Sequence, residues 1–172
     1  MTKILVTGAS GFVGIHMLDA LVIANRSVIA LHNRPLPEYL RDRYKGKVTW
    51  RQVDIVNDDL SEIVADIDTV YHLAAYVSNS ESSEDVKLMD QVNVLGTQRL
   101  SFASRKAGVR HFIFVSSVAA GSNVLDEEDV LSLSPYGRSK REAEEKCLKL
   151  STTDFGVTVL RPSALFGEYH KG

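Results

Sequence analysis

The sequence predicts an α/β domain in three layers, with a doubly wound parallel sheet between two layers of helices. Three observations lead to this expectation. Short apolar runs typical of strands buried on both faces recur along the chain. Most of them are followed by a segment whose apolar residues repeat at helical spacing, and the first pair is joined by a glycine-rich turn. A chain of 172 residues is long enough for one domain with a substantial core, so we assign residues 1–172 to a single domain.

The first strand, turn and helix carry the strongest signal. Residues 4–6 are apolar, and a helix is expected to continue to Ala24. Between them stand Gly8, Gly11 and Gly14. Glycine permits a tight turn out of the strand, close approach of the backbone to a pyrophosphate, and close packing of the helix on the sheet. The helix amino terminus adds unpaired N–H groups and a partial positive charge. The pattern predicts a Rossmann-like dinucleotide site, the alternative being a glycine turn that only joins strand to helix.

The second strand is expected over residues 28–31, and its end predicts which cofactor binds. In such folds an acidic residue at this place binds the ribose 2′-hydroxyl of NAD, whereas an arginine accommodates the 2′-phosphate of NADP. Here His32 stands where the acidic residue would be, and Arg34 lies close by with a side chain suited to phosphate. We therefore expect NADP rather than NAD. The alternative is that Arg34 is an ordinary exposed loop cation.

The alternation continues through the middle of the chain. We expect in order a short helix, a third strand, another helix and a fourth strand, over residues 36–45, 48–53, 59–65 and 68–73. Small residues close the fourth strand and leave space for the cofactor, while His72 is interpreted as a packed strand histidine rather than a catalytic one.

A polar loop and a long helix follow the fourth strand. The loop, residues 78–85, crosses the open end of the sheet, where it either touches substrate or is simply solvated. The helix is expected over residues 85–107 and carries Asn93 among apolar positions. A polar residue in a buried helical seam is costly unless it has a role.

The residues that carry chemistry lie in the second half. A fifth strand is expected over residues 109–117, a helix over residues 136–150 and a sixth strand over residues 157–160. Tyr136 and Lys140 are four residues apart and share one helical face. A phenol of pKa about 10 is a poor base near neutrality, and a nearby ammonium stabilises the phenolate.

Ser117 falls where the fifth strand reaches the carboxyl edge of the sheet, at which ligands of such sheets bind. There it can hydrogen-bond a substrate oxygen while Tyr136 exchanges its proton and hydride moves to or from a nicotinamide. Ser116 is the near alternative, because strand facing decides between adjacent positions.

Five stretches, all in the expected order, resemble the extended short-chain dehydrogenases/reductases, the NAD(P)-dependent epimerase/dehydratase and dihydroflavonol-reductase-like group. They are Thr7-Gly8-x-x-Gly11-Phe12-Val13-Gly14, His72-Leu73-Ala74-Ala75, Asn93-Val94-x-Gly96-Thr97, Ser116-Ser117 and Tyr136-x-x-x-Lys140. The resemblance implies that Ser117, Tyr136 and Lys140 are catalytic. It further implies an adenine contact for Asp54, which otherwise only starts a turn. The residues expected to bind the cofactor are Gly8, Ser10, Gly11, Phe12, Val13, Gly14, His32, Arg34, Asp54, Ile55, Leu73, Ala74, Ala75, Asn93, Ser116, Tyr136, Lys140, Arg161 and Pro162.

Departures from that pattern narrow the chemistry. Sugar-nucleotide dehydratases of this group usually have Asp-Glu where Val118-Ala119 stand, and many epimerases have a tyrosine where Ala120 stands. We therefore expect a reductase, dehydrogenase or epimerase, the alternative being a module that binds NAD(P) without turnover. Residues 126–129 are interpreted as a solvated acidic loop. Full members continue well beyond residue 172, so the C-terminal substrate domain is expected to be largely absent.

Bulk composition limits the partners. The chain is 44% hydrophobic and 24% charged, and its net charge of -2 gives no general attraction for nucleic acid or anionic membranes. Cys147 is the only cysteine, and neither a signal peptide nor a membrane span is evident, so a cytoplasmic protein is expected. We expect a small-molecule substrate, assign no metal site, and infer from the resemblance a homodimer formed through the two long helices.

Overall fold

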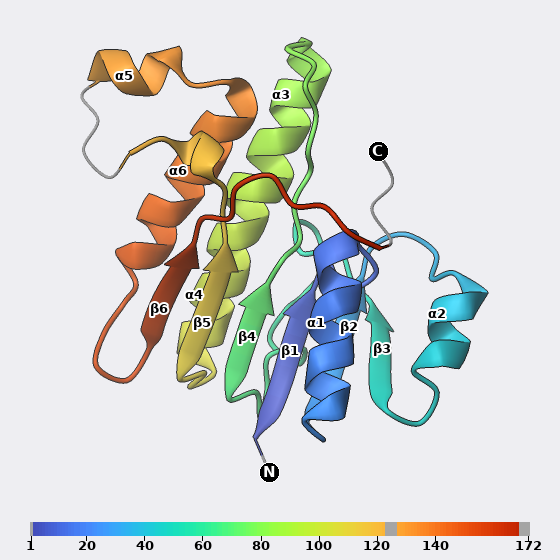
Figure 1. Cartoon of the computed structure of the whole chain (residues 1–172). Helices are drawn as coiled ribbons and strands as arrows, with labels where there is room; N and C mark the ends of the chain where they lie inside the picture. Colours follow the sequence, from blue (N-terminus) through green and yellow to red (C-terminus); the bar gives the residue numbers. More distant parts are fainter. Residues whose placement is uncertain (1, 123–126, 169–172) are drawn as a thin grey trace.

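The computed structural model describes residues 2–122 and 127–168, whose backbone forms the expected layers (Figure 1). In chain order the elements are β1 (Lys3–Thr7), α1 (Phe12–Ile23), β2 (Ser27–His32), α2 (Glu38–Arg43), β3 (Val48–Gln52), β4 (Thr69–His72), α3 (Ser83–Met89), the π-helical turn η1 (Asp90–Gly96), α4 (Thr97–Lys106), β5 (His111–Val115), the 3₁₀ turn η2 (Val118–Ala120), α5 (Glu127–Ser132), α6 (Pro135–Leu148) and β6 (Gly156–Leu160).

The strands pair in parallel in the order β3-β2-β1-β4-β5-β6. The chain moves outward from β1 to β3 and then returns to place β4 on the other side of β1. The point between β1 and β4 is therefore the topological switch point, outside which ligands of doubly wound sheets bind. The predicted fold class, a Rossmann-like doubly wound sheet, is confirmed.

Two hydrophobic cores lie on opposite faces of the sheet, because neighbouring residues of a strand point to opposite sides. Leu5 of β1 belongs to a buried cluster with Leu100 of α4 and Cys147 of α6. Val6, the next residue, belongs to a second cluster with Leu18 of α1 and Leu40 of α2. Strand β1 is thus buried on both faces.

Residues 59 and 60 have no regular structure and residues 61–66 form turns and a bend, so the prediction of a helix over residues 59–65 is wrong. The Asp59 carboxylate accepts hydrogen bonds from the Ser61 backbone N–H (2.9 Å) and hydroxyl (2.8 Å), which offers the backbone an alternative to a helix. Asp66 has a φ of 59°, which stops any helical continuation. The apolar pattern is still used, since Leu60 is buried in the core.

Part of the expected acidic loop is also a helix. Helix α5 begins at Glu127, while Asp126 lies outside the described residues. Acidic residues at the start of a helix are stabilised by its dipole, and this favours a helix over a solvated loop. In the described part of the chain, the helices are too short or too polar to cross a bilayer.

Candidate active site and cofactor crevice

The glycine turn brings three backbone segments into direct contact. Gly8 has a φ of +63°, and a Cβ there would lie 2.7 Å from the backbone nitrogen of Ala74. A Cβ on Gly14 would lie 2.3 Å from the carbonyl oxygen of Gly8. Gly11 stands before α1 and donates its N–H to the Gly8 carbonyl at 3.0 Å. The turn, the first turn of α1 and the end of β4 therefore touch at distances that admit no side chain, as the sequence predicted for Gly8 and Gly14.

A cavity of about 650 Å³ opens at this switch point, between the glycine turn and the ends of β2, β3 and β4. It is lined by most of the residues expected to bind the cofactor in the first half of the chain: Gly8, Ser10, Gly11, His32, Arg34, Asp54, Ile55, Leu73, Ala74 and Ala75. Phe12, Val13 and Gly14 form the first turn of α1 beside it.

The sequence reasoning missed several residues that also line this cavity, among them Thr7, Tyr76 and Val77. The signal was available for two of them. Tyr76 and Val77 directly follow the small residues at the end of β4, so their position in the sequence places them at the same edge of the sheet. Thr7 stands at the start of the glycine motif, and the sequence alone predicts no contact for its side chain.

The two polar side chains at the ends of β2 and β3 are held by local bonds. His32 donates from Nδ1 to the Arg34 carbonyl at 2.7 Å, because a carbonyl oxygen can only accept. The Asp54 carboxylate accepts from the Val56 N–H and from the Asn57 side chain, both at 2.8 Å. Both bonds lower the pKa of Asp54, and the bond from Val56 has the larger effect. Asp54 thus starts a turn, and its contact with adenine stays a prediction.

Beneath the cavity, His72 is fully buried and bonded on both ring nitrogens. Thr7 Oγ1 lies 2.7 Å from Nδ1, and Thr97 Oγ1 lies 2.8 Å from Nε2. Thr7 Oγ1 already accepts the N–H groups of Leu73 (3.2 Å) and Ala74 (3.1 Å). Its own proton is therefore the one shared with Nδ1, so His72 is neutral with its proton on Nε2. Burial lowers the pKa of His72 to about 3, and the prediction of a packed strand histidine is confirmed.

Asn93 lies in η1, which interrupts the long helix expected over residues 85–107. Its Oδ1 accepts the Tyr76 N–H at 2.8 Å, and its Nδ2 donates to the Tyr76 carbonyl at 2.9 Å and to Ser139 Oγ at 3.0 Å. A π-helical turn often marks a functional position. Asn93 therefore fixes the loop beside the cavity to α6, and it does not itself line the cavity.

Ser117 is the N-cap of η2, and residues 117–121, called the Ser117 turn below, pack against α6 through Ala119. Ser117 Oγ accepts the N–H of Ala119 at 3.1 Å, which leaves its own proton to donate. Ser116 Oγ is buried and has no hydrogen-bond partner in the described part of the chain, so Ser117 is the more accessible of the two. A Cβ on Gly137, the residue after Tyr136, would lie 2.2 Å from the Ala119 carbonyl oxygen. The Ser117 turn and the start of α6 are therefore in direct contact.

Tyr136 and Lys140 differ in exposure. Tyr136 is half-buried, and burial raises its pKa. Lys140 is only 1% exposed: Nζ donates to the Val115 carbonyl at 2.9 Å and lies 4.2 Å from the centre of the Phe114 ring. Burial lowers the pKa of Lys140 to about 8, with the Glu144 carboxylate opposing that effect. The ammonium is thus engaged by strand β5, and the lower pKa expected for Tyr136 is not found in this structure.

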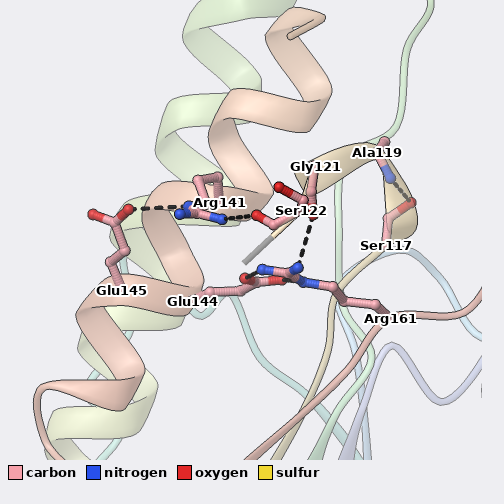
Figure 2. A network of polar contacts seen from close by, with 8 residues as sticks. All are labelled: Ser117, Ala119, Gly121, Ser122, Arg141, Glu144, Glu145 and Arg161. Atoms are coloured by element: carbon pink, nitrogen blue, oxygen red, sulfur yellow. Dashed lines mark hydrogen bonds and ion pairs between the residues drawn. The ribbon is translucent and has the colours of Figure 1, made fainter. Parts of the chain in front are cut away.

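Arg161 and Pro162 follow β6 and contact the Ser117 turn instead of the 650 Å³ cavity. The Pro162 carbonyl accepts the Val118 N–H at 3.1 Å. The Arg161 guanidinium donates from Nε to Glu144 at 2.8 Å, from Nη2 to the second oxygen of Glu144, and from Nη1 to the Gly121 carbonyl at 2.8 Å (Figure 2). The cofactor contacts expected for both residues stay predictions.

Comparisons with known proteins agree with this geometry. The sequence model of the NAD dependent epimerase/dehydratase family matches residues 4–172. A putative UDP-glucose 4-epimerase of Methanocaldococcus jannaschii is 35% identical over 175 residues, covering 96% of this chain and 56% of its own length. A 3-beta-hydroxysteroid dehydrogenase of Mycolicibacterium neoaurum is 30% identical, covering 96% of this chain and 48% of its own.

Solved structures give the same result. A UDP-glucuronic acid 4-epimerase from Bacillus cereus in complex with NAD superimposes with a TM-score of 0.82 at 29% identity, covering 99% of this chain and 58% of that one. MoeE5 in complex with UDP-glucuronic acid and NAD gives 0.73 at 33% identity, covering 91% and 52%. The chain spans about half the length of the curated relatives it matches.

Proposed function

Because the chain belongs to the NAD dependent epimerase/dehydratase family, we propose that it is the NAD(P)-binding domain of an oxidoreductase or epimerase. The whole enzyme would act by hydride transfer on a secondary alcohol or carbonyl of a small molecule. One observation carries this proposal. Gly8, Ala74 and Ser117 follow the neighbouring parallel strands β1, β4 and β5, so the glycine turn and the proposed catalytic residues meet the same carboxyl edge of the sheet. We assign no residue of this chain to the enclosure of the substrate.

The crevice fits a dinucleotide. Gly8 and Gly14 leave no room for a Cβ, so backbone rather than side chains faces the turn, and the amino terminus of α1 supplies N–H donors for a pyrophosphate. Bound NAD(P) would supply the hydride donor or acceptor. Arg34 lines the cavity and no carboxylate ends β2, which supports NADP over NAD.

The chain's own residues would handle the proton. Burial keeps the Tyr136 phenol protonated at neutral pH, so it can give its proton to a carbonyl oxygen during reduction. Ser117 can donate a second hydrogen bond to the same oxygen, since its Oγ accepts from Ala119 and its proton is available. Lys140, mostly protonated near pH 7, would hold ribose hydroxyls and offset negative charge on Tyr136.

The relatives suggest two substrate classes. Relatives named as UDP-sugar epimerases support a nucleotide sugar, and relatives named as 3-beta-hydroxysteroid dehydrogenases support a sterol. We propose the nucleotide sugar, because a relative at 35% identity is named as a putative UDP-glucose 4-epimerase and MoeE5, at 33–34% identity, was crystallised with UDP-glucuronic acid or UDP-glucose. Val118-Ala119 in place of Asp-Glu argues against dehydration.

The test is Tyr136→Phe in a version of the protein that turns over UDP-glucose, with net oxidation followed by nicotinamide absorbance and epimerisation followed by chromatography of the UDP-sugars. Loss of the hydroxyl should lower the rate by about 10²-fold or more, the contribution of a positioned general acid. NAD(P)H affinity, measured by nicotinamide fluorescence, should change little. A retained rate would overturn the catalytic assignment. Cofactor binding without turnover of either substrate class in the unmodified protein would instead support a non-catalytic NAD(P)-binding module.

We also propose a cytoplasmic homodimer that pairs through the long helices. Leu95 and Phe102 are exposed along η1 and α4, and Leu148 is exposed on α6. Such side chains are suited to an interface between helices. A molar mass of twice that of the chain, measured by light scattering, would support the dimer, and a monomeric mass would refute it.

A further inference from the structure

An ion pair between the buried Glu144 and the half-buried Arg161 joins α6 to the segment after β6. The Glu144 side chain is 3% exposed, and both of its oxygens accept from Arg161. Hydrogen bonding to Glu144 raises the pKa of Arg161, so the guanidinium stays charged. Burying two charges costs desolvation energy that apolar residues of similar volume would avoid, and such a pair is therefore weak evidence for a role in stability alone. Its geometry indicates another role.

The remaining nitrogen of the Arg161 guanidinium, Nη1, contacts the last residue of the Ser117 turn. Nη1 donates to the Gly121 carbonyl at 2.8 Å, and Gly121, with a φ of +78°, ends η2 (Figure 2). The near end of the same turn begins at Ser117. A planar guanidinium can serve a carboxylate with two nitrogens and a carbonyl with the third, which a lysine cannot. Arg161 thus ties the turn to the Glu144 position of α6.

The other side of the turn is held by direct backbone contact. Gly137 lies between Tyr136 and Lys140, and its missing Cβ lets α6 approach the Ala119 carbonyl. The Ser117 turn is therefore held between the start of α6 and the Arg161 guanidinium, called the Arg161 fork below. The fork is bonded to Glu144, which lies two helical turns beyond Gly137 on the same helix.

We propose that Glu144 and Arg161 are positioning residues that fix the Ser117 turn against α6 and so set the Ser117 hydroxyl relative to Tyr136. This inference rests on the proposed function, because it assigns a purpose to that geometry. It gives Arg161 a role distinct from binding the cofactor. The Arg161 fork should therefore affect the order of the turn and the rate of chemistry, and not the affinity for NAD(P)H.

The experiment compares Arg161→Met, the double variant E144M/R161M and the matched control Arg43→Met. Arg43 makes the same two-nitrogen contact with a carboxylate, that of Asp19 at 3.2 and 2.7 Å, but joins α2 to α1 away from Ser117. The readout is amide hydrogen exchange at Ala119 and Gly121, with thermal stability and NADH affinity measured on the same samples.

Arg161→Met should raise exchange at both amides about tenfold to a hundredfold, the factor expected when a hydrogen bond to a charged group is lost. The double variant should regain thermal stability, because no unpaired charge stays buried, yet keep the fast exchange, because the Gly121 carbonyl still lacks its donor. Arg43→Met should leave both amides unchanged. In a version that turns over substrate, kcat should fall about a hundredfold in Arg161→Met with KM for the cofactor unchanged.

Several outcomes would overturn the inference. Unchanged exchange at both amides in Arg161→Met would remove the positioning role. Recovery of protection in the double variant would reduce the pair to a stabilising contact. A loss of NADH affinity confined to the Arg161 variants would make Arg161 a cofactor residue. If the unmodified protein bound no NAD(P)H at all, the proposed function would fail, while the exchange data would still decide whether the fork holds the turn.

Discussion

Two parts of the carboxyl edge of the sheet, the cofactor end at β1 and β4 and the catalytic end at β5 and β6, are built differently. Strand β1 is buried on both faces, and the glycine turn that follows it meets β4 through backbone alone. Strands β5 and β6 bury one face: Phe112 and Phe114 point into the core, whereas Leu160 is 46% exposed. The turn after β5 has one backbone contact of this kind, at Gly137, and is otherwise held by hydrogen bonds from side chains, among them that of Arg161. The cofactor end thus depends on close backbone packing, and the catalytic end depends in addition on particular polar side chains.

This difference has consequences for how each end responds to change. A side chain added where backbones touch must displace a strand or a helix, and therefore affects folding and binding together. A side chain removed from the catalytic end releases one loop and leaves the sheet in place. Substitutions of the first kind should have the largest effects on stability.

Gly8→Ala should be the most damaging of the simple substitutions. The left-handed backbone costs an alanine about 1–2 kcal/mol. The new Cβ would overlap the Ala74 nitrogen, and overpacking costs a further amount of about 1–3 kcal/mol. We expect the free energy of unfolding to fall by about 2–5 kcal/mol, measured by urea denaturation, with loss of NAD(P)H binding.

Gly46→Ala is the matched control. Gly46 has a φ of +71°, close to that of Gly8, but a Cβ there meets no atom within 4 Å. Only the backbone cost of about 1–2 kcal/mol should appear. If the two variants lost equal stability, the contact with the end of β4 would contribute nothing, and the contrast between the two ends would fail.

His72 should give an effect that is small near neutral pH and grows as the pH falls. Its pKa is about 3 in the folded protein against 6.5 in the unfolded chain, so below pH 6.5 the unfolded state binds a proton that the folded state refuses. Stability should be unaffected above pH 6.5 and fall by about 1.4 kcal/mol per pH unit between 6.5 and about 3. Urea denaturation at several pH values would measure this.

Since carboxylates contribute their own pH dependence, the informative quantity is the difference from His72→Gln. The glutamine variant should be less stable at pH 7, because it reproduces only one of the two bonds to Thr7 and Thr97, and its stability should fall less steeply with acid. If the stability of the two proteins fell equally with acid, His72 would be protonated in the folded protein as it is in the unfolded chain.

The contrast also explains what the sequence could reveal. The close backbone packing at Gly8 and Gly14 was predicted correctly, because glycine spacing encodes backbone geometry within one stretch of chain. The partners of Arg161 were not predicted, since Glu144 and Gly121 lie far from it in sequence and no local pattern pairs them. Residues 59–65 were assigned the wrong structure because apolar spacing recorded burial correctly while local side-chain bonds decided the backbone.

The sequence predicts only part of the network formed by Thr7, His72 and Thr97. The burial of His72 followed from its apolar neighbours, and the sequence interpretation was right to that extent. Its tautomer followed only from counting donors and acceptors on three elements that the fold brings together. Sequence patterns therefore predicted where the chain packs, and the structure was needed to show which polar groups meet.

Arg34→Ala should have the smallest effect and would refine the comparison within the cofactor end. Arg34 is an exposed side chain at the cavity, so its removal should not change the fold. If it contacts a 2′-phosphate, NADPH affinity should fall about tenfold, the low end for a bond to a charged group, and NADH affinity should change less than about twofold. Nicotinamide fluorescence measures both, with Arg41→Ala, an exposed arginine of α2, as the control. Equal losses for the two cofactors would show that Arg34 acts only as a general cation, and tighter binding of NADH by the unmodified protein would contradict the NADP preference. Backbone would then set where a dinucleotide binds, and no side chain at the end of β2 would select between the two.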